Sequence, residues 1–163
     1  MRFEVTQAFA APAEQVIALY TSTGMYESLP DFDKISRPEV LDHQADDERV
    51  VMKLRYSFIA DLPAAALAVI DSDKLTWIET TTYDLAARTA TVEFAPDHYA
   101  SKMTATATVE FASVDEGSTR EIFGDLRVRI MLVGGQVERT IVSGLREHLT
   151  TEGEAVNAML VAR

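Results

Sequence analysis

The sequence contains no cysteine among its 163 residues, which excludes disulfides, thiolate nucleophiles and cysteine-based zinc or iron–sulfur sites. Its three histidines, His43, His98 and His148, show neither HExxH nor HxH spacing, so we expect no metal site. The first six residues alternate in polarity and lack the unbroken apolar core of a signal peptide. The longest mostly apolar stretch, residues 62–70, is too short to cross a bilayer. We therefore expect a soluble cytoplasmic protein with no membrane insertion and no cofactor.

The sequence also has fewer basic than acidic residues. Lys and Arg number 15 against 26 Asp and Glu, which gives a formal net charge of −11. Such a surface repels phosphate backbones, so we expect no nucleic-acid partner. The length suits one domain over residues 1–163, and a hydrophobic share of 47% is enough for a core.

The N-terminal third predicts a strand followed by two short helices. Residues 2–10 alternate with period two, with Phe3 and Phe9 on one face, as in an edge or near-edge strand. Pro12 then suits the first turn of a helix that the pair Thr23-Gly24 ends. Residues 25–29 predict a second short helix, stopped by Pro30.

From Ile35 the period of two returns and predicts about six further strands, the last over residues 119–132. Thr-rich outer faces are typical of an antiparallel sheet with one packed and one solvated side. The residues assigned to the packed side are Val50, Met52, Leu54, Tyr56, Phe58, Leu75, Trp77, Glu79, Thr81, Tyr83, Ala90, Val92, Phe94, Met103, Ala105, Ala107, Val109, Phe111, Ile122, Leu126, Val128 and Ile130. With this phase, Arg127 and Arg129 point to water.

After a tight turn at Gly134-Gly135, the chain predicts one long amphipathic helix. Its apolar stripe contains Val137, Ile141, Leu145, Val156, Met159 and Leu160. One long helix can cover the concave face of a meandering antiparallel sheet. The predicted fold class is therefore α+β: a helix-grip fold with a curved sheet of about seven strands around the C-terminal helix.

Two segments resemble a known superfamily. Residues 3–6 (FEVT) with 9–16 (FAAPAEQV) resemble the opening of START-related proteins (the SRPBCC group), which include the major birch pollen allergen and polyketide cyclases. Residues 130–138 (IMLVGGQVE) resemble a strand-to-helix junction in an uncharacterised actinobacterial family of that superfamily. The resemblance implies an internal apolar pocket for a lipid or polyketide-like ligand. Because the superfamily shares no catalytic motif, it transfers no catalytic residue.

The candidate ligand-binding residues combine adaptable apolar side chains with a few polar groups. His148 and Glu152 lie one turn apart inside the apolar stripe of the helix, where they could bond a ligand or form a surface contact at the cavity mouth. Glu79 faces the cavity unless a bulge inverts its strand, and burial would raise its pKa. The full candidate set is Met52, Tyr56, Phe58, Trp77, Glu79, Tyr83, Met103, Ile141, Leu145, His148 and Glu152. The apolar members could equally fill a solid core.

Three functions follow from these features. The leading hypothesis is binding of a small hydrophobic or amphipathic molecule in an internal cavity. The second is a cyclase or aromatase-type enzyme that uses His148, Glu152 and Glu79 as acid–base groups, which requires these groups to converge. The third is a protein-interaction module, which predicts an exposed apolar patch and no internal pocket. The sequence favours binding over catalysis and does not fix the oligomeric state.

Overall fold

A computed structural model describes residues 1–162 and confirms the α+β helix-grip fold. Seven antiparallel strands form one curved sheet in the order β1-β7-β6-β5-β4-β3-β2, so the first strand is at one edge, as predicted. Every connection from β2 to β7 joins neighbouring strands, which is the meander that short turns allow. The strands are β1 (Arg2–Phe9), β2 (Glu39–Ala45), β3 (Arg49–Ser57), β4 (Thr76–Asp84), β5 (Thr89–Pro96), β6 (Met103–Val114) and β7 (Gly117–Val128).

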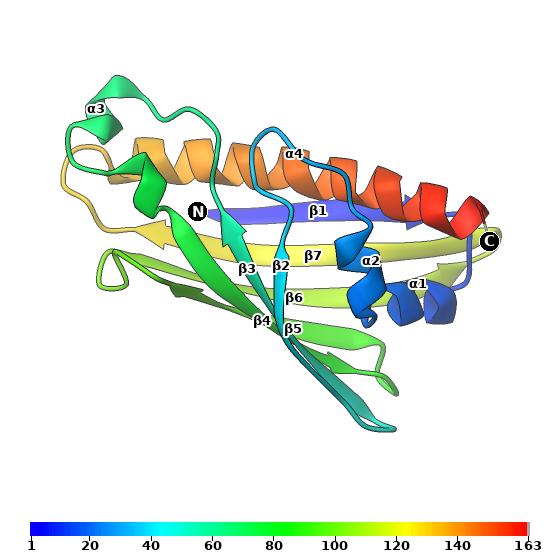
Figure 1. Cartoon of the computed structure of the whole chain (residues 1–163). Helices are drawn as coiled ribbons and strands as arrows, with labels where there is room; N and C mark the ends of the chain where they lie inside the picture. The colour runs from blue at the N-terminus through cyan, green and yellow to red at the C-terminus, as the bar shows by residue number, and fades with distance from the viewer. Residues whose placement is uncertain (163) are drawn as a thin grey trace.

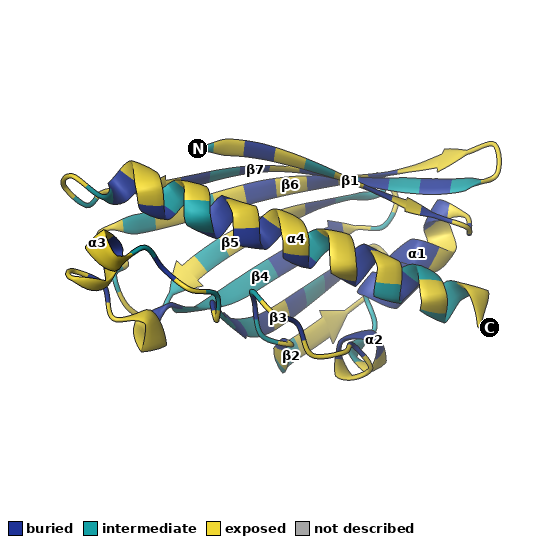
Figure 2. Ribbon diagram, turned by 90° about the horizontal axis from the view of Figure 1, so that it is seen from above, coloured by how far each residue is buried: buried dark blue, intermediate teal, exposed yellow. Residues whose placement is uncertain are grey.

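The helices lie on the concave side and at the two ends of the sheet (Figure 1). The long helix α4 crosses the sheet above β1 and β7, with α1 and α2 at one end and α3 at the other. Figure 2 shows that α4 turns a buried stripe toward the strands and an exposed stripe away from them. The helices are α1 (Ala13–Tyr20), α2 (Thr23–Glu27), α3 (Ala64–Leu67) and α4 (Gly134–Val161), with a 3-10 turn at Ser72–Lys74.

Two glycines let α4 lie close to its neighbours. A Cβ at Gly153 would be only 3.0 Å from the side-chain nitrogen of Gln7 on β1, and a Cβ at Gly144 would be 2.8 Å from the ring of Phe58. Both glycines are buried on the face of α4 that meets the sheet. A larger residue would push the helix outward, so these positions set the distance between helix and sheet.

The structure corrects the sequence prediction at two element boundaries. Thr23-Gly24 begins α2 instead of ending α1, which already stops at Tyr20. The last strand ends at Val128 rather than at residue 132, because its partner β6 begins at Met103, directly opposite Val128; Leu132, with a φ of 70°, lies in the turn before α4. The apolar run there indicated a strand, yet Met131 and Leu132 are almost fully exposed in this turn. Arg127 and Arg129 are exposed, as predicted.

Replacing Gly124 by alanine is expected to destabilise the fold by about 1–3 kcal/mol, because it overpacks the core. Gly124 leaves room for the ring of Phe3, whose Cζ would lie 2.2 Å from an added Cβ. Urea unfolding of Gly124→Ala measures this loss. Gly135→Ala is the control, since its Cβ would meet only Arg139 at 3.7 Å. Equal stability of Gly124→Ala and the parent protein would contradict this packing.

Candidate functional site

The space between α4 and the sheet is partly hollow. Trp77, Glu79, Phe94 and Met103 lie on the inner face of the sheet, where tight packing would bury them fully, yet each keeps accessible surface. That surface faces two small adjoining cavities, which we name the outer and inner chambers. The residues that line both chambers, and so form the partition between them, are Phe3, Trp77, Phe94 and Leu145.

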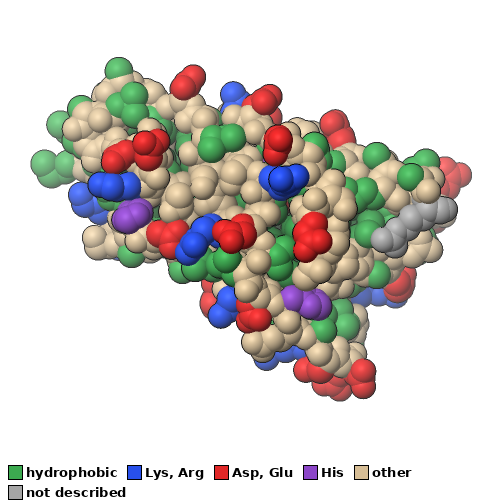
Figure 3. Space-filling model, in the orientation of Figure 1, with side chains coloured by type: hydrophobic (Ala, Val, Ile, Leu, Met, Phe, Trp, Pro, Cys, Tyr) green, Lys and Arg blue, Asp and Glu red, His purple; other side chains and the backbone are tan. Residues whose placement is uncertain are grey.

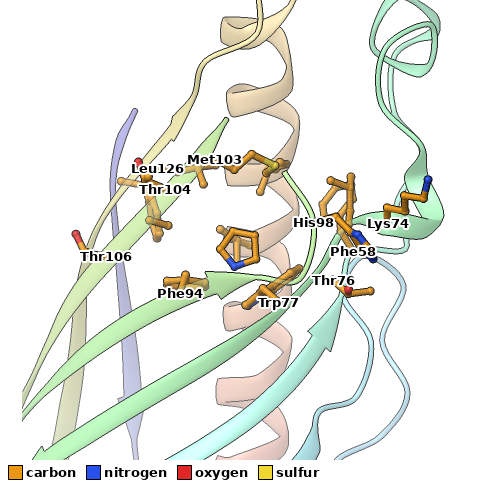
Figure 4. A pocket seen from close by; sticks show the side chains of 16 residues that line it. Phe58, Lys74, Thr76, Trp77, Phe94, His98, Met103, Thr104, Thr106 and Leu126 are labelled. Atoms are coloured by element: carbon orange, nitrogen blue, oxygen red, sulfur yellow. The ribbon is translucent and has the colours of Figure 1, made fainter. Parts of the chain in front are cut away.

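The outer chamber is apolar and reaches the surface. Its volume is about 50 Å³, and exposed residues such as Lys74, His98 and Thr104 belong to its lining. Figure 4 shows its side chains arranged around the space beside α4, with Trp77 and Phe94 among them. Besides the partition, its apolar walls are Phe58, Leu75, Pro96, Met103, Ala105, Leu126 and Ile141.

The inner chamber has a similar volume of about 50 Å³ but is lined by many polar groups. They come from six elements, since α1, α2, β3, β4, β7 and α4 each contribute at least one. These polar or titratable residues are Tyr20, Tyr26, Tyr56, Glu79, Arg120, His148 and Glu152. An amphipathic cavity thus runs from an apolar entrance to a polar interior.

A buried ion pair anchors the polar end of the inner chamber. Arg120 on β7 donates from Nη1 to Oε1 of Glu152 on α4 at 3.1 Å and to Oε1 of Gln7 on β1 at 2.9 Å. Its guanidinium lies 4.0 Å above the centre of the Tyr20 ring. Both partners of the ion pair are over nine-tenths buried. Arginine stays charged in proteins, so Glu152 supplies the compensating charge.

Glu79 lies in the inner chamber without a charged partner. Its Oε1 accepts a hydrogen bond from the hydroxyl of Thr81 at 3.2 Å. No basic side chain within residues 1–162 lies at ion-pairing distance from Glu79. Burial, reinforced by the negative charge of Glu152, raises the pKa of Glu79 to about 7. The carboxyl can therefore gain or lose a proton near neutral pH.

His148 lines the same chamber as a neutral imidazole. Burial lowers the pKa of His148 despite the nearby Glu152 carboxylate. Its Nε2 is 3.7 Å from Oε2 of Glu152, and its buried Nδ1 has no hydrogen-bond partner within the described chain. The ring packs edge-on against Phe32 at 4.5 Å and against Tyr56 at 5.9 Å. These contacts fix the ring at the chamber wall.

Aromatic rings form a continuous wall between the chambers. Tyr56 and Trp77 stack with ring centres 5.6 Å apart, and Trp77 meets Phe94 at 6.2 Å. The three rings come from the neighbouring strands β3, β4 and β5, where Tyr56 is directly opposite Trp77. The stack holds the aromatic part of the partition in place.

Most of the candidate residues chosen from the sequence lie on these two cavities. Nine line one chamber or both, namely Tyr56, Phe58, Trp77, Glu79, Met103, Ile141, Leu145, His148 and Glu152. Met52 and Tyr83 belong to neither lining and lie in the packed core. His98 is exposed at the outer chamber, and His43 is exposed on β2, where its Nε2 contacts the carbonyl of Thr21 at 2.9 Å.

The sequence prediction missed Arg120, the residue that ties the polar groups together. The alternation could have identified it, because residue 120 is an even number of positions from Ile122 and Leu126. Those two residues were assigned to the inner face, so Arg120 lies on that face as well. Gln7 has the same strand alternation as Phe3 and Phe9, and no role was predicted for it from the sequence. Its amide nitrogen donates a hydrogen bond to the carbonyl of Leu149, and its amide oxygen accepts one from Arg120.

Several solved structures share the helix-grip fold of this chain. TTHA0849 from Thermus thermophilus has a TM-score of 0.68 at 15% identity, over 99% of this chain and 98% of that one. The Zhui aromatase/cyclase from Streptomyces sp. R1128 has a TM-score of 0.62 at 16% identity, over 98% and 92%. Norcoclaurine synthase from Thalictrum flavum, in complex with dopamine and hydroxybenzaldehyde, has 0.63 at 16% identity, over 100% and 87%. At identities this low, the similarity shows a shared fold and does not transfer a function.

Three further observations concern membrane spans and family membership. In the stretch from residue 1 to 162, no helix combines the length and apolar character needed to cross a membrane. A comparison with curated proteins finds no match. A family profile, in contrast, matches residues 4–160, and the chain therefore belongs to the family described as "Protein of unknown function (DUF2505)".

Proposed function

We propose that the protein binds a small amphipathic molecule, lipid-like or polyketide-like, in the two chambers between α4 and the sheet. The apolar body of the ligand occupies the outer chamber, and its polar group reaches the inner one. The supporting observation is the polarity gradient along one cavity, from Met103 and Phe58 near the surface to Glu79 and Arg120 inside. Ligand sites commonly combine apolar walls with a few convergent polar groups.

The size of the chambers requires the partition to move on binding. Each chamber measures about 50 Å³. An apolar cavity of about 150 Å³ is the size known to hold benzene. A ligand with one ring therefore exceeds either chamber alone, and a larger ligand requires Trp77 and Phe94 to be displaced so that the two chambers merge and widen. Trp77 is the only tryptophan in the chain, so its fluorescence reports this displacement directly.

Titration with the neutral fluorophore N-phenyl-1-naphthylamine tests the proposal. We expect saturable binding, with energy transfer from Trp77 to the dye. Ala105→Phe fills the outer chamber and should weaken binding by about ten-fold or more, since the ring takes the ligand's volume. Ala112→Phe is the matched control, because Ala112 is exposed and lies on the same strand, β6, facing away from the chambers.

Two results would oppose this function. One is the absence of saturable binding by the parent protein. The other is equal affinity of Ala105→Phe and Ala112→Phe, which would place the dye outside the chambers. Circular dichroism of both variants shows whether the fold is retained.

An acid–base enzyme is the second candidate. Its requirement was that Glu79, His148 and Glu152 converge, and all three line the inner chamber. Glu79 supports this function most, because a group with a pKa of about 7 can donate or accept a proton near neutrality. The binding proposal covers a binding protein and an enzyme alike, since a substrate must enter the same cavity.

The interaction-module hypothesis has less support, because it predicted no internal pocket.

A further inference from the structure

We infer that the polar group taken up by the inner chamber is a cation, a protonated amine attached to an aromatic or apolar body. This inference rests on the proposed function and specifies its ligand class. Two observations support it: the inner chamber contains a carboxyl group without a counter-ion, and its walls are aromatic.

Glu79 is the uncompensated charge of the inner chamber. The opposite charges of Arg120 and Glu152 are only 3.1 Å apart and cancel each other. The guanidinium is further held by Gln7 and by the face of Tyr20. Ionised Glu79 has only the hydroxyl of Thr81 as a partner. A buried carboxylate without a counter-ion is costly, and an incoming ammonium group would supply the missing charge.

The other titratable groups around Glu79 do not supply that charge. Facing the chamber are His148 and Glu152 on α4, Arg120 on β7, Tyr56 on β3, Tyr26 on α2 and Tyr20 on α1. The imidazole is neutral, and burial raises the pKa of all three tyrosines well above the usual value, so they stay uncharged. Glu152 raises the pKa of Glu79 and Arg120 lowers it, so this ion pair does not supply a counter-charge for Glu79.

The walls of the chamber suit the same ligand. Tyr56, Trp77 and Phe94 line the inner chamber together with Glu79, and Phe94 is directly opposite Glu79 on the adjacent strand. Aromatic faces attract ammonium groups, and a desolvated site strengthens that attraction. The net charge of −11 adds a long-range field that draws cations toward the molecule. Figure 3 shows acidic side chains spread over one face of the surface.

Three probes that share a phenyl body test the ligand class: 2-phenylethylamine, 2-phenylethanol and 3-phenylpropanoate. Calorimetry and Trp77 fluorescence at about pH 8, where Glu79 is ionised, measure their affinities. We expect the amine to bind about ten-fold or more tightly than the alcohol, and the carboxylate to bind weakest. Glu79→Gln should abolish the preference. Glu93→Gln, exposed on β5, should leave it intact.

The pH dependence gives a second readout. Below about pH 7 the proton competes with the amine for Glu79, so affinity for the amine should fall by up to about ten-fold per unit while affinity for the alcohol stays constant. Equal affinity for amine and alcohol would overturn the cation assignment but leave the binding function standing. Failure of all three probes together with N-phenyl-1-naphthylamine would overturn both.

Discussion

Replacing Arg120 by alanine is expected to lower the free energy of unfolding by about 3–5 kcal/mol, the largest effect of any single substitution considered for this protein. The reason is that Glu152 would remain buried with its charge uncompensated. The side chain of Glu152 is 4% exposed, so water cannot replace the lost partner. Gln7 and Tyr20 would lose their contact with the guanidinium at the same time.

Urea unfolding of Arg120→Ala measures this loss against a matched control. Arg127→Ala removes an exposed arginine of the same strand, whose ion pair with Asp125 spans 3.2 Å, and should cost no more than about 1 kcal/mol. The double variant Arg120→Met with Glu152→Leu removes both charges and should recover most of the stability. A small loss of stability in Arg120→Ala would contradict the role of this pair. So would a double variant that is less stable than Arg120→Ala.

Replacing Glu79 by glutamine is expected to stabilise the protein at about pH 8 and to have little effect at about pH 4. Burial raises the pKa of Glu79 from 4.5 to about 7, so between these values the folded protein holds a proton that the unfolded chain has released. Stability contributed by this group is therefore complete below pH 4.5 and is lost as the pH rises through 7. The pKa shift corresponds to a loss of stability of roughly 3 kcal/mol. This is an upper value, because the side chain of Glu79 keeps accessible surface in the chamber.

The measurement is the difference in unfolding free energy between Glu79→Gln and the parent protein across this pH range. Taking the difference matters because Asp125 and Glu138, whose pKa values are lowered, give the parent protein an opposite trend at acid pH. Glu93→Gln, at an exposed position, should show no such change. A difference that stays flat with pH would mean that Glu79 titrates normally and is not enclosed as described.

The architecture could be predicted from the sequence because its signals are periodic. Alternation over 75–83 assigns Trp77 and Glu79 to one face, and the structure places both on the cavity. The stripe on the last helix likewise put His148 and Glu152 toward the sheet. In each case a repeating pattern spread over several residues determines which side is buried.

The remaining features depend on contacts between distant parts of the chain. Arg120 meets Glu152 across 32 residues and Gln7 across 113, and no local pattern pairs them. The volume between helix and sheet depends on close approaches such as that of Gly153 to Gln7. Periodicity shows which face is inside but gives no information on whether the inside is filled.

The most direct test of the central claim is a crystal structure of the protein bound to N-phenyl-1-naphthylamine. We predict the dye between α4 and the sheet, with its aromatic rings against Met103 and Phe58 and with Trp77 displaced from its stack on Tyr56. A dye bound instead at the exposed turn of Met131 and Leu132, with both chambers unchanged, would contradict the claim that the cavity is the binding site.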